Sequence, residues 1–411
     1  MSLWTIVLRN LAQRKLSSAL TAASVSLGVA VVVTVLALKA QSLEGFARCA
    51  RYHLVVGPKG SALQLVLGTV YHLDELSATM PWARYKELAA HKAVKFAVPI
   101  SVGDQVGGFR VVATTDAFFD LEIEAGRPPE IEGRRFKFNA EQLEHAMAGH
   151  GEGHEHGGDF EAVAGSTAAK ALGLAVGSPL LASHGLADGG EKHQETWTVV
   201  GVMKPTGTPH DRAVFINLDS FYGIRDHRAA ARLSAVLVEA RGGNAPDQLR
   251  AEINDWPDAM AVKPSLVIED LFQLIGKVDI LLLAVAVLVI VVGAVSILVS
   301  IYNSMAERRR AIAILRALGA RRTTILSIVI LEAAALCFFG GAAGLFLGHL
   351  LTAVASRVLS EGAGVSISAV SFDPRELGIL AAVVLLGVLA GVVPALRAYR
   401  TDIADGLSPS S

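Results

Sequence analysis

Four long apolar runs divide this chain into membrane-spanning and aqueous segments. The runs at residues 16–39, 278–306, 323–359 and 377–396 are each long enough to cross the hydrocarbon core of a bilayer, which takes about 20 predominantly apolar residues. The third run, with its extension to residue 359, contains Glu332 and is rich in glycine. The pattern therefore predicts a membrane protein with four transmembrane α-helices.

Basic residues gather beside particular ends of these runs and predict their orientation. Lysine and arginine are enriched on the cytoplasmic side of membrane proteins. Here they are Arg9, Arg14 and Lys15 before the first run, Arg308, Arg309, Arg310, Arg316, Arg321 and Arg322 between the second and third, and Arg397 and Arg400 after the fourth. We expect residues 1–15 (an amphipathic segment), 307–322 and 397–411 (a tail) to be cytoplasmic. Residues 40–277 and the short loop 360–376 are then external.

The large external segment has the pattern of a folded α+β domain inserted between the first and second transmembrane helices. Short runs rich in β-branched and aromatic residues predict strands, at Tyr52–Val56, Val94–Ile100, Phe109–Thr114, Thr196–Met203, Ala213–Ile216 and Ser234–Val238. Helices are predicted at Pro81–His91, Ser166–Leu172 and Ala245–Asn254. Pro81 suits a first helical turn and Gly173 a helix stop. Interleaved short helices and strands favour an α+β architecture.

Composition and charge agree with a membrane protein and exclude some partners. Of the 411 residues 52% are hydrophobic and 18% charged, whereas a soluble domain has about 25% charged residues. The formal net charge of −1 gives no indication of nucleic-acid binding. Cys49 and Cys337 are too few for a disulfide framework, and both are expected to be unpaired.

Residues 307–322, ERRRAIAILRALGARR, predict a short amphipathic helix between two spans. Its apolar face, at helical spacing, consists of Ala311, Ile314, Leu315 and Leu318. Arg309 and Arg316 lie opposite, and Gly319 offers a stop. One interpretation is a topology signal that binds anionic lipid headgroups. The other is a docking helix for a cytoplasmic partner.

The sequence ERRRAIAILRALGARRTTILSIVILEAAALCFFGGAAGLFLG, from residue 307 to 348, resembles the membrane signature of the FtsX/MacB-type ABC transporter permeases. In that family an acidic-arginine start leads into an I-x-I-L-R-A-L-G-A helix, followed by a span with an early glutamate and a glycine-rich middle. The matching positions are Glu307, Arg308, Arg309, Ile312, Ile314, Leu315, Arg316, Ala317, Leu318, Gly319, Ala320 and Glu332.

Two further regions carry the resemblance. The ending VVPALRAYRTDIADGL is similar to the family pattern P-A-x-R-A-A-x-x-D-P-x-x-A-L, with Ile403 where proline is usual. Three external pieces, GFRVVATTDAFFDLEIEAGRPP, VAGSTAAKALGLAVGSPL and WTVVGVMKPTGTPHDRAVFINLDSFYGI, resemble successive parts of the periplasmic core domain of these permeases. The resemblance therefore covers nearly the whole chain.

The resemblance implies a permease subunit of the bacterial cytoplasmic (inner) membrane, with a periplasmic domain and no enzymatic activity of its own. Such permeases pair as dimers, a homodimer being expected here, and bind a separate ATPase that holds the ATP and Mg²⁺. The cytoplasmic coupling helix contacts the ATPase, and movement is transmitted to a periplasmic substrate or partner. The resemblance assigns this contact to Glu307, Arg308, Arg309, Ile312, Ile314, Leu315, Arg316, Leu318 and Gly319.

The residues themselves agree with a separate ATPase, because no G-x-x-x-x-G-K-[ST] phosphate loop occurs in the sequence. Glu332, inside the third span, is a candidate mechanistic residue, since carboxylates in hydrocarbon are costly and usually face a partner. The alternative is a non-ABC receptor whose external domain binds a ligand or metal and whose arginine helix only anchors it. A metal-dependent hydrolase has no supporting nucleophile–base constellation.

Residues 145–161, HAMAGHGEGHEHGGDFE, form a histidine-rich stretch that the family pattern does not expect. Imidazole and carboxylate are the usual ligands of Zn²⁺ and related metals, and a glycine-rich backbone could fold around an ion. The candidate ligands are His145, His150, His154, His156, Glu152 and Asp159. The competing interpretation is a solvated loop with incidental histidines. The other external histidines are expected to be scattered surface or packing residues: His53, His72, His184, His193 and His210.

Overall fold

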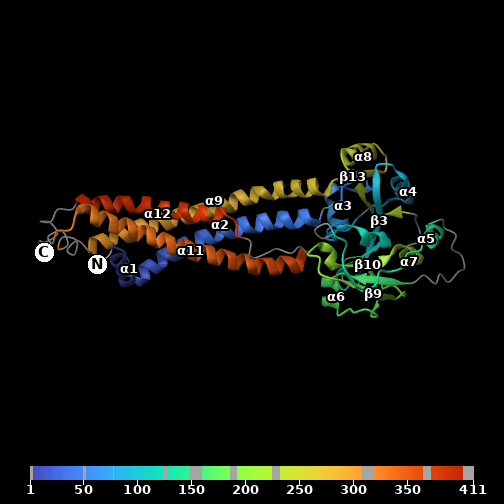
Figure 1. Ribbon diagram of the computed structural model, residues 1–411, viewed down its shortest axis with the longest axis horizontal. Coiled ribbons are helices and arrows are strands. Elements are labelled where there is room, and N and C mark those ends of the chain that lie inside the picture. Colours follow the sequence, from blue (N-terminus) through green and yellow to red (C-terminus); the bar gives the residue numbers. More distant parts are fainter. Residues whose placement is uncertain are drawn as a thin grey trace. The chain divides into compact units, whose positions relative to one another are not determined.

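The computed structural model divides the chain into two compact units, drawn in Figure 1. The helical unit comprises Met1–Gln41, Ile275–Arg357 and Ser368–Ser411, and the α+β domain comprises Ser42–Leu274 and Val358–Ile367. The residues that the structure describes are 3–49, 52–76, 78–123, 127–147, 160–185, 192–224, 232–307, 314, 319–363 and 372–400.

Five long helices contain nearly all described residues of the helical unit. They are α1 (Leu3–Gln13), α2 (Lys15–Cys49), α9 (Pro264–Glu307), α11 (Arg322–Ala363) and α12 (Arg375–Arg400). Three segments of the described residues are long and apolar enough to cross a membrane: Lys15–Ala40, Arg322–Ser356 and Arg375–Val392. In α9 the apolar stretch Leu283–Val299 is shorter. Three of the four predicted spans are thus found among the described residues, and the fourth, expected in α9, stays a prediction.

The helical unit has its own apolar core, to which four of these helices contribute. Its buried residues are Val25, Val29 and Val33 of α2, Ile297 and Ile301 of α9, Val329, Ala333 and Cys337 of α11, and Val383 of α12. Cys337 is a free cysteine, as expected from the sequence. The outward sides of the same helices carry exposed leucine, valine and phenylalanine side chains, the pattern of helices surrounded by lipid.

The α+β domain is built on one large mixed sheet. Among the described residues it has 11 strands, with the path β13-β1-β12-β3-β4-β10-β6-β9-β5, while β7 pairs with β9 and β8 with β3. The β4–β10 and β6–β9 pairs are parallel and the other pairs are antiparallel. The strands are β1 (Leu54–Pro58), β3 (Val94–Val106), β4 (Phe109–Thr114), β5 (Ile131–Gly133), β6 (Glu161–Ala164), β7 (Pro179–Leu180), β8 (Ser183–His184), β9 (Trp197–Met203), β10 (Ala213–Asn217), β12 (Ala235–Ala240) and β13 (Ala259–Val262). A separate pair joins β2 (Met80–Pro81) to β11 (Arg232–Leu233).

Both faces of the sheet are buried. Successive side chains of a strand point to opposite faces, and here they belong to two different apolar clusters. Leu54 and Val56 of β1 lie in one cluster and Val55 in the other; the same division separates Val214 from Phe215 in β10. One face is covered by α4 (Trp82–Ala90), α5 (Ala140–Met147), α6 (Ser166–Leu172), α7 (Leu218–Gly223) and α8 (Ala245–Asn254). The other is covered by α3 (Ala62–Thr69), the 3₁₀ helix η1 (Asp116–Asp120) and the first turns of α9, while η2 (Pro209–Arg212) precedes β10.

All six predicted strands and all three predicted helices are present at nearly the predicted positions. Gly173 ends α6 in the left-handed region, with φ +65°. Helix α4 begins at Trp82, one residue later than predicted, and Pro81 is its N-cap residue. The short strands β6 and β13 were not predicted from the sequence. Each has only four residues and follows turn-like sequence.

Candidate functional site

Helix α11 packs closely against α2 through a row of glycines. A Cβ atom added at Gly344 would lie 2.6 Å from the carbonyl oxygen of Ser26, and one at Gly340 would lie 2.9 Å from that of Ala22. At Gly348 the nearest atoms would be Val33 Cβ and Cγ1, at 2.9 Å. Glycine at every fourth position is the arrangement that lets two membrane helices approach backbone to backbone.

The same helix also packs closely against α12. A Cβ atom at Gly387 would lie 2.3 Å from the Cys337 sulfur, and one at Gly391 would lie 2.9 Å from Ala333 Cβ. In the opposite direction, a Cβ atom added at Gly341 of α11 would lie 2.6 Å from Leu380 Cδ1 of α12. Helix α11 is therefore held on two sides by contacts that larger side chains would prevent, and it can be expected to move together with α2 and α12.

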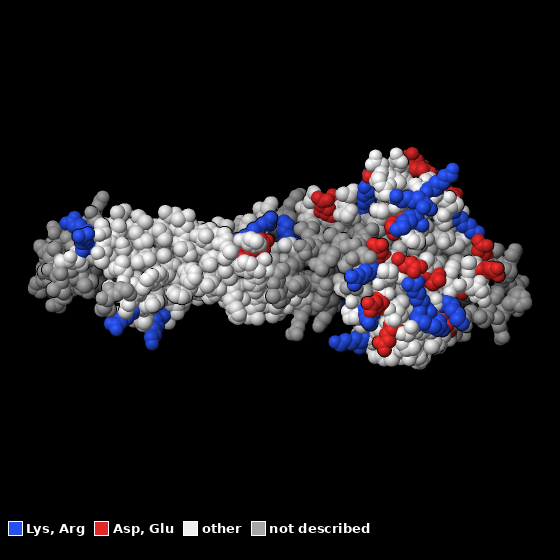
Figure 2. Space-filling view, in the orientation of Figure 1, with Lys and Arg blue, Asp and Glu red and all other residues white. Residues whose placement is uncertain are grey.

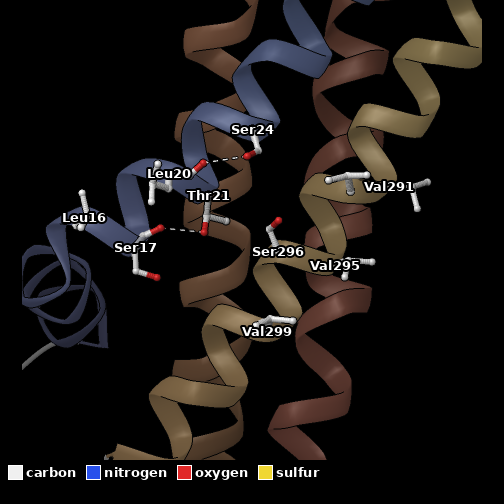
Figure 3. Close-up of a pocket in the computed structure, with 10 residues that line it drawn as sticks. Leu16, Ser17, Leu20, Thr21, Ser24, Val291, Val295, Ser296 and Val299 are labelled. Atoms are coloured by element: carbon white, nitrogen blue, oxygen red, sulfur yellow. Dashed lines mark hydrogen bonds between the residues drawn. The ribbon is translucent and has the colours of Figure 1, made fainter.

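An open groove of about 570 Å³ lies between α2 and α9 (Figure 3). The α2 side presents three hydroxyl-bearing residues, of which Thr21 Oγ1 donates to the Ser17 carbonyl at 2.9 Å and Ser24 Oγ to the Leu20 carbonyl at 3.0 Å. The α9 side is mostly valine. Because two of these hydroxyls donate within their own helix and the other lining residues are mostly apolar, the groove suits lipid or another apolar helix rather than a polar ligand.

The predicted coupling helix falls between the end of α9 at Glu307 and the start of α11 at Arg322. Six of its predicted docking residues lie outside the described residues: Arg308, Arg309, Ile312, Leu315, Arg316 and Leu318. Ile314 is described and is 46% exposed. Gly319 has φ +93°, the left-handed conformation that favours glycine at a helix stop. This conformation agrees with the helix end expected there.

Glu332 lies on α11 beside Ala333 and is 8% exposed. A carboxylate in this position is enclosed by the helical unit rather than by water. Burial of this kind requires a compensating partner or a bound proton. The position fits the predicted mechanistic role, which stays a prediction.

Charged side chains are distributed unevenly over the described residues. On the face shown in Figure 2, lysine, arginine, aspartate and glutamate cover much of the α+β domain, whereas long stretches of the helices carry none. This distribution agrees with one unit that lies in lipid and another that lies in water.

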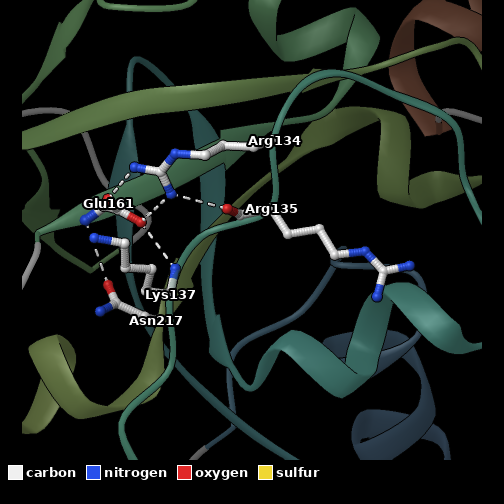
Figure 4. A network of polar contacts seen from close by, with 5 residues as sticks. All are labelled: Arg134, Arg135, Lys137, Glu161 and Asn217. Carbon is white, nitrogen blue, oxygen red and sulfur yellow. Dashed lines mark hydrogen bonds and ion pairs between the residues drawn. The ribbon is translucent and has the colours of Figure 1, made fainter.

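Most of the histidine-rich stretch lies outside the described residues, including His150, Glu152, His154, His156 and Asp159. His145 belongs to α5, and its side chain also lies outside the description. The chain is described again from Phe160, and Glu161 anchors it (Figure 4). Glu161 accepts hydrogen bonds from both terminal nitrogens of the Arg134 guanidinium and, at 2.8 Å, from the backbone N–H of Lys137.

Four of the remaining histidines form two clusters, in which His72, His193 and His210 are buried and His184 is partly exposed. The expectation that they are scattered is therefore wrong, although three of them are packing residues. In the first cluster, Tyr52 Oη lies 2.8 Å from His210 Nε2, and His72 Nε2 lies 3.0 Å from His210 Nδ1. Burial lowers the pKa of His210 to about 3 and lowers that of His72 as well. Both imidazoles are therefore neutral at physiological pH.

In the second cluster, Asp104 lies between His184 and His193. Both distances from a carboxylate oxygen to an imidazole nitrogen are 3.1 Å. Burial raises the pKa of Asp104, and the two imidazoles oppose this effect. These residues were missed because they are separated by up to 89 positions in the sequence; the only available signal was the pair of histidines on either side of a short glycine-containing segment.

Comparison with known proteins places these features in a family. The MacB-like periplasmic core domain matches residues 18–256, more than half of the chain, and the FtsX-like permease C-terminal region matches residues 283–403. The chain belongs to the FtsX/MacB-type ABC transporter permeases. This membership confirms the family predicted from the arginine-helix motif, and with it a transmembrane permease that carries a large MacB-like domain.

Individual relatives of this FtsX/MacB-type permease match part of its length. An uncharacterized ABC transporter permease of Methanocaldococcus jannaschii is 30% identical over 222 residues, which is 51% of this chain and 54% of the relative. The macrolide export ATP-binding/permease protein MacB of Rhodopirellula baltica is 32% identical over 182 residues, covering 44% of this chain and 25% of the relative. The alignments thus span about half of the first relative and a quarter of the second.

A solved structure is also similar to this permease. It is the periplasmic region of MacB from Actinobacillus actinomycetemcomitans, with 9% sequence identity and a TM-score of 0.35, covering 55% of this chain and 94% of that one.

Proposed function

We propose that this chain is the membrane permease subunit of an ABC transporter that couples ATP hydrolysis in a separate ATPase to movement of a periplasmic substrate or partner. The observation that carries the proposal is the joint match, in one chain, of the FtsX-like permease region and the MacB-like periplasmic core domain. The sequence has no phosphate loop, so ATP and Mg²⁺ are assigned to the ATPase and this chain to transmission.

The proposed ATPase contact is the basic segment 307–322. Its predicted apolar face would fill a groove on the ATPase while Arg309 and Arg316 pair with acidic side chains, in the manner of a helix that binds a groove. This segment joins α9, which ends at Glu307, to α11, which begins at Arg322. A displacement of the segment therefore acts on both helices.

Helix α9 supplies one covalent route for transmission. It is a single helix from Pro264 to Glu307. Ile268 in its first turns is 4% exposed in the core of the α+β domain, with Val267, Leu271 and Phe272 packed beside it. Force applied near Glu307 can thus reach the core of the external domain along one helix, without a pore through the membrane.

Helices α11 and α2 supply a second route. The glycine contacts between them at Gly340 and Gly344 join α11 to α2, and α2 runs on to Cys49, shortly before β1. We propose that α2, α11 and α12 move together, since glycine contacts join α11 to both of its neighbours.

The proposed setting is the bacterial inner membrane, with four spans and both termini in the cytoplasm, as the basic residues beside the apolar runs indicate. Two permease copies would bind two ATPase copies. Relatives are named macrolide export proteins; for this chain we propose only that the transported or moved molecule contacts the α+β domain.

Co-purification tests the proposal. The full chain, in lipid nanodiscs, is incubated with a candidate ABC ATPase, and bound ATPase is measured for the parent, for Arg309→Glu/Arg316→Glu and for Arg84→Gln, which changes an arginine of the α+β domain. Binding by the parent, with loss in the coupling-helix variant and not in Arg84→Gln (a neutral change at a residue that pairs with Glu87 and Asp258), supports it. Absence of binding by the parent would favour a receptor that uses its arginine helix as an anchor.

A further inference from the structure

Three potential metal ligands converge in the α+β domain, away from the histidine-rich stretch considered above. Asp104 Oδ1 lies 3.1 Å from His184 Nδ1, and Asp104 Oδ2 lies 3.1 Å from His193 Nε2. One ligand atom from each residue can be chosen so that all three lie within 4.8 Å of one another. The two imidazole rings meet edge to face, with centroids 4.2 Å apart.

The backbone brings these side chains together from three adjacent extended segments. Asp104 and His184 are paired residues of the antiparallel strands β3 and β8. The backbone N–H of His193 donates to the Ala182 carbonyl at 3.0 Å, which places the third segment beside β8. Strand β3 has an irregularity in its pairing with β4 between Val102 and Asp104, and such bulges redirect side chains. The ligands are therefore positioned by the sheet rather than by a free loop.

The donor set selects a class of ion. Two imidazole nitrogens and one carboxylate oxygen suit Zn²⁺ and neighbouring divalent transition metals, whereas Mg²⁺ and Ca²⁺ take oxygen ligands. A tetrahedral Zn²⁺ at about 2.0–2.2 Å from each ligand would hold ligand atoms about 3.3 Å apart, close to the two 3.1 Å distances. The two 3.1 Å distances involve different carboxylate oxygens, and the three ligand atoms lie within 4.8 Å of one another, so side-chain rotations would have to draw them together around the ion.

Burial and access also fit a bound ion. The side chains of Asp104 and His193 are 0% and 2% exposed, while that of His184 is 38% exposed. The inner two ligands are thus fixed by their surroundings, and the outer one leaves a path for an ion and for one water molecule. A catalytic or exchangeable zinc site has this composition, with three protein ligands and one open position.

The competing explanation is a purely structural hydrogen-bonded cluster. In that case each imidazole nitrogen facing the carboxylate carries a proton: His193 Nε2–H donates a hydrogen bond to Asp104 Oδ2, and a protonated His184 forms an ion pair with Oδ1. A metal ion would replace both protons at the same positions, so the two explanations differ in whether the cluster releases its protons to a cation.

We propose that Asp104, His184 and His193 bind one divalent transition-metal ion, with Zn²⁺ as the representative. This site is distinct in sequence from the histidine-rich stretch. The proposal does not depend on the permease function: an ion here would connect β3 to the segment that contains His184 and His193 whether or not an ATPase binds.

The test uses the full chain in detergent, with the histidine-rich stretch disabled by replacing His145, His150, His154 and His156 with serine. Zn²⁺ alone is titrated by calorimetry, and Co²⁺ is titrated in parallel because its visible absorption reports nitrogen ligation and coordination number. The result expected is about one equivalent of ion per chain, with a rise in thermal unfolding temperature as the ion saturates the folded state.

Single variants in that background then assign the site. His184→Ala, at the half-exposed ligand, should weaken binding more than about tenfold, since even outer-shell changes cost about 10–100-fold in metal affinity. Asp104→Asn should do the same. His91→Ala is the matched control, because His91 faces Glu252 at 3.4 Å as a partly exposed histidine–carboxylate pair without a second imidazole; it should bind as its parent does.

Two results would overturn the proposal. One is the absence of saturable binding in the protein with the disabled stretch. The other is binding that is unchanged in His184→Ala, which is expected to fold because that side chain is partly exposed. Loss of binding in His184→Ala with an unchanged unfolding temperature of the metal-free protein supports it, even where Asp104→Asn fails to fold.

Discussion

The carbonyl oxygen of Ser26 lies 2.6 Å from the position that a Cβ atom on Gly344 would occupy, so α2 and α11 meet backbone to backbone at this point. Neighbouring glycines repeat the contact one turn away on either side. In hydrocarbon, where burial from water contributes little between helices, such close packing is a main source of association. The proposed transmission between the ATPase and the external domain therefore requires α2 and α11 to move as one body.

Replacing Gly344 with alanine should separate these helices. The added methyl group would overlap a backbone atom, which cannot rotate away, so we expect a loss of about 1–3 kcal/mol in the free energy of unfolding. Thermal unfolding of the purified protein in detergent measures it. Gly378→Ala in α12 is the control, because a Cβ atom there would meet nothing within 4 Å and alanine favours a helix by about 1 kcal/mol over glycine. Equal unfolding temperatures for the two variants would show that the contact is not close.

Glu332→Gln should reduce ATPase stimulation by the permease while leaving its folding intact. Glu332 is 8% exposed inside the helical unit, and glutamine keeps its shape while removing its charge. We expect stimulation to fall about tenfold, equivalent to about 1.4 kcal/mol. Glu376→Gln is the matched control: Glu376 is also buried, and it pairs with His349 at 2.9 Å. If both variants reduce stimulation equally, Glu332 has no special role.

His210 should make the α+β domain sensitive to acid. Its folded pKa is lowered from 6.5 to about 3 by burial, so the unfolded chain binds a proton between these values while the folded chain does not. Its contribution to stability is therefore complete above pH 6.5 and decreases as the pH falls towards 3, by about 1.4 kcal/mol per pH unit.

The His210→Gln variant tests this dependence, because glutamine does not titrate. Unfolding by urea is measured from pH 4 to 8 for parent and variant, and the difference between their free energies isolates His210 from other buried groups. The pKa of His72 is also lowered, so some slope should remain in the variant. A difference that does not change with pH would contradict the neutral state assigned to His210.

Glu161, rather than the stretch before it, should stabilise this part of the domain. Glu161→Ala removes the acceptor for Arg134 and for the Lys137 N–H, and loss of partners for such groups costs about 1–3 kcal/mol. Replacing residues 148–159 with a short glycine-serine link should leave the unfolding temperature unchanged. A larger loss from the link than from Glu161→Ala would show that the stretch itself carries the stability.

Much of this architecture could be predicted because its signals are local. Short continuous runs of apolar residues such as Leu54, Val55 and Val56 identify buried strands, and the long apolar runs identify the helices. The sheet order could not be predicted, since β4 pairs with β10 across about a hundred residues. The Asp104 cluster could not be predicted either, because His184 and His193 come close to Asp104 only when β3 pairs with β8.

The helical unit shows the same limit. The glycines of α11 were visible in the sequence. Their partners could not be predicted: Gly344 faces Ser26 of α2, whereas Gly341 faces Leu380 of α12. Opposite sides of one helix contact different partners, and this choice depends on packing of all the helices together.

Coupling between this permease and its ATPase is tested by the activity of the ATPase, measured with the permease reconstituted in lipid. The parent is compared with Leu315→Asp, which places a charge on the predicted apolar face of the coupling helix, and with Leu315→Met, which keeps that face apolar. If the segment couples the two proteins, ATP hydrolysis depends on the permease, persists with Leu315→Met and collapses with Leu315→Asp. An ATPase rate that is the same with the parent, with Leu315→Asp and without any permease would contradict it.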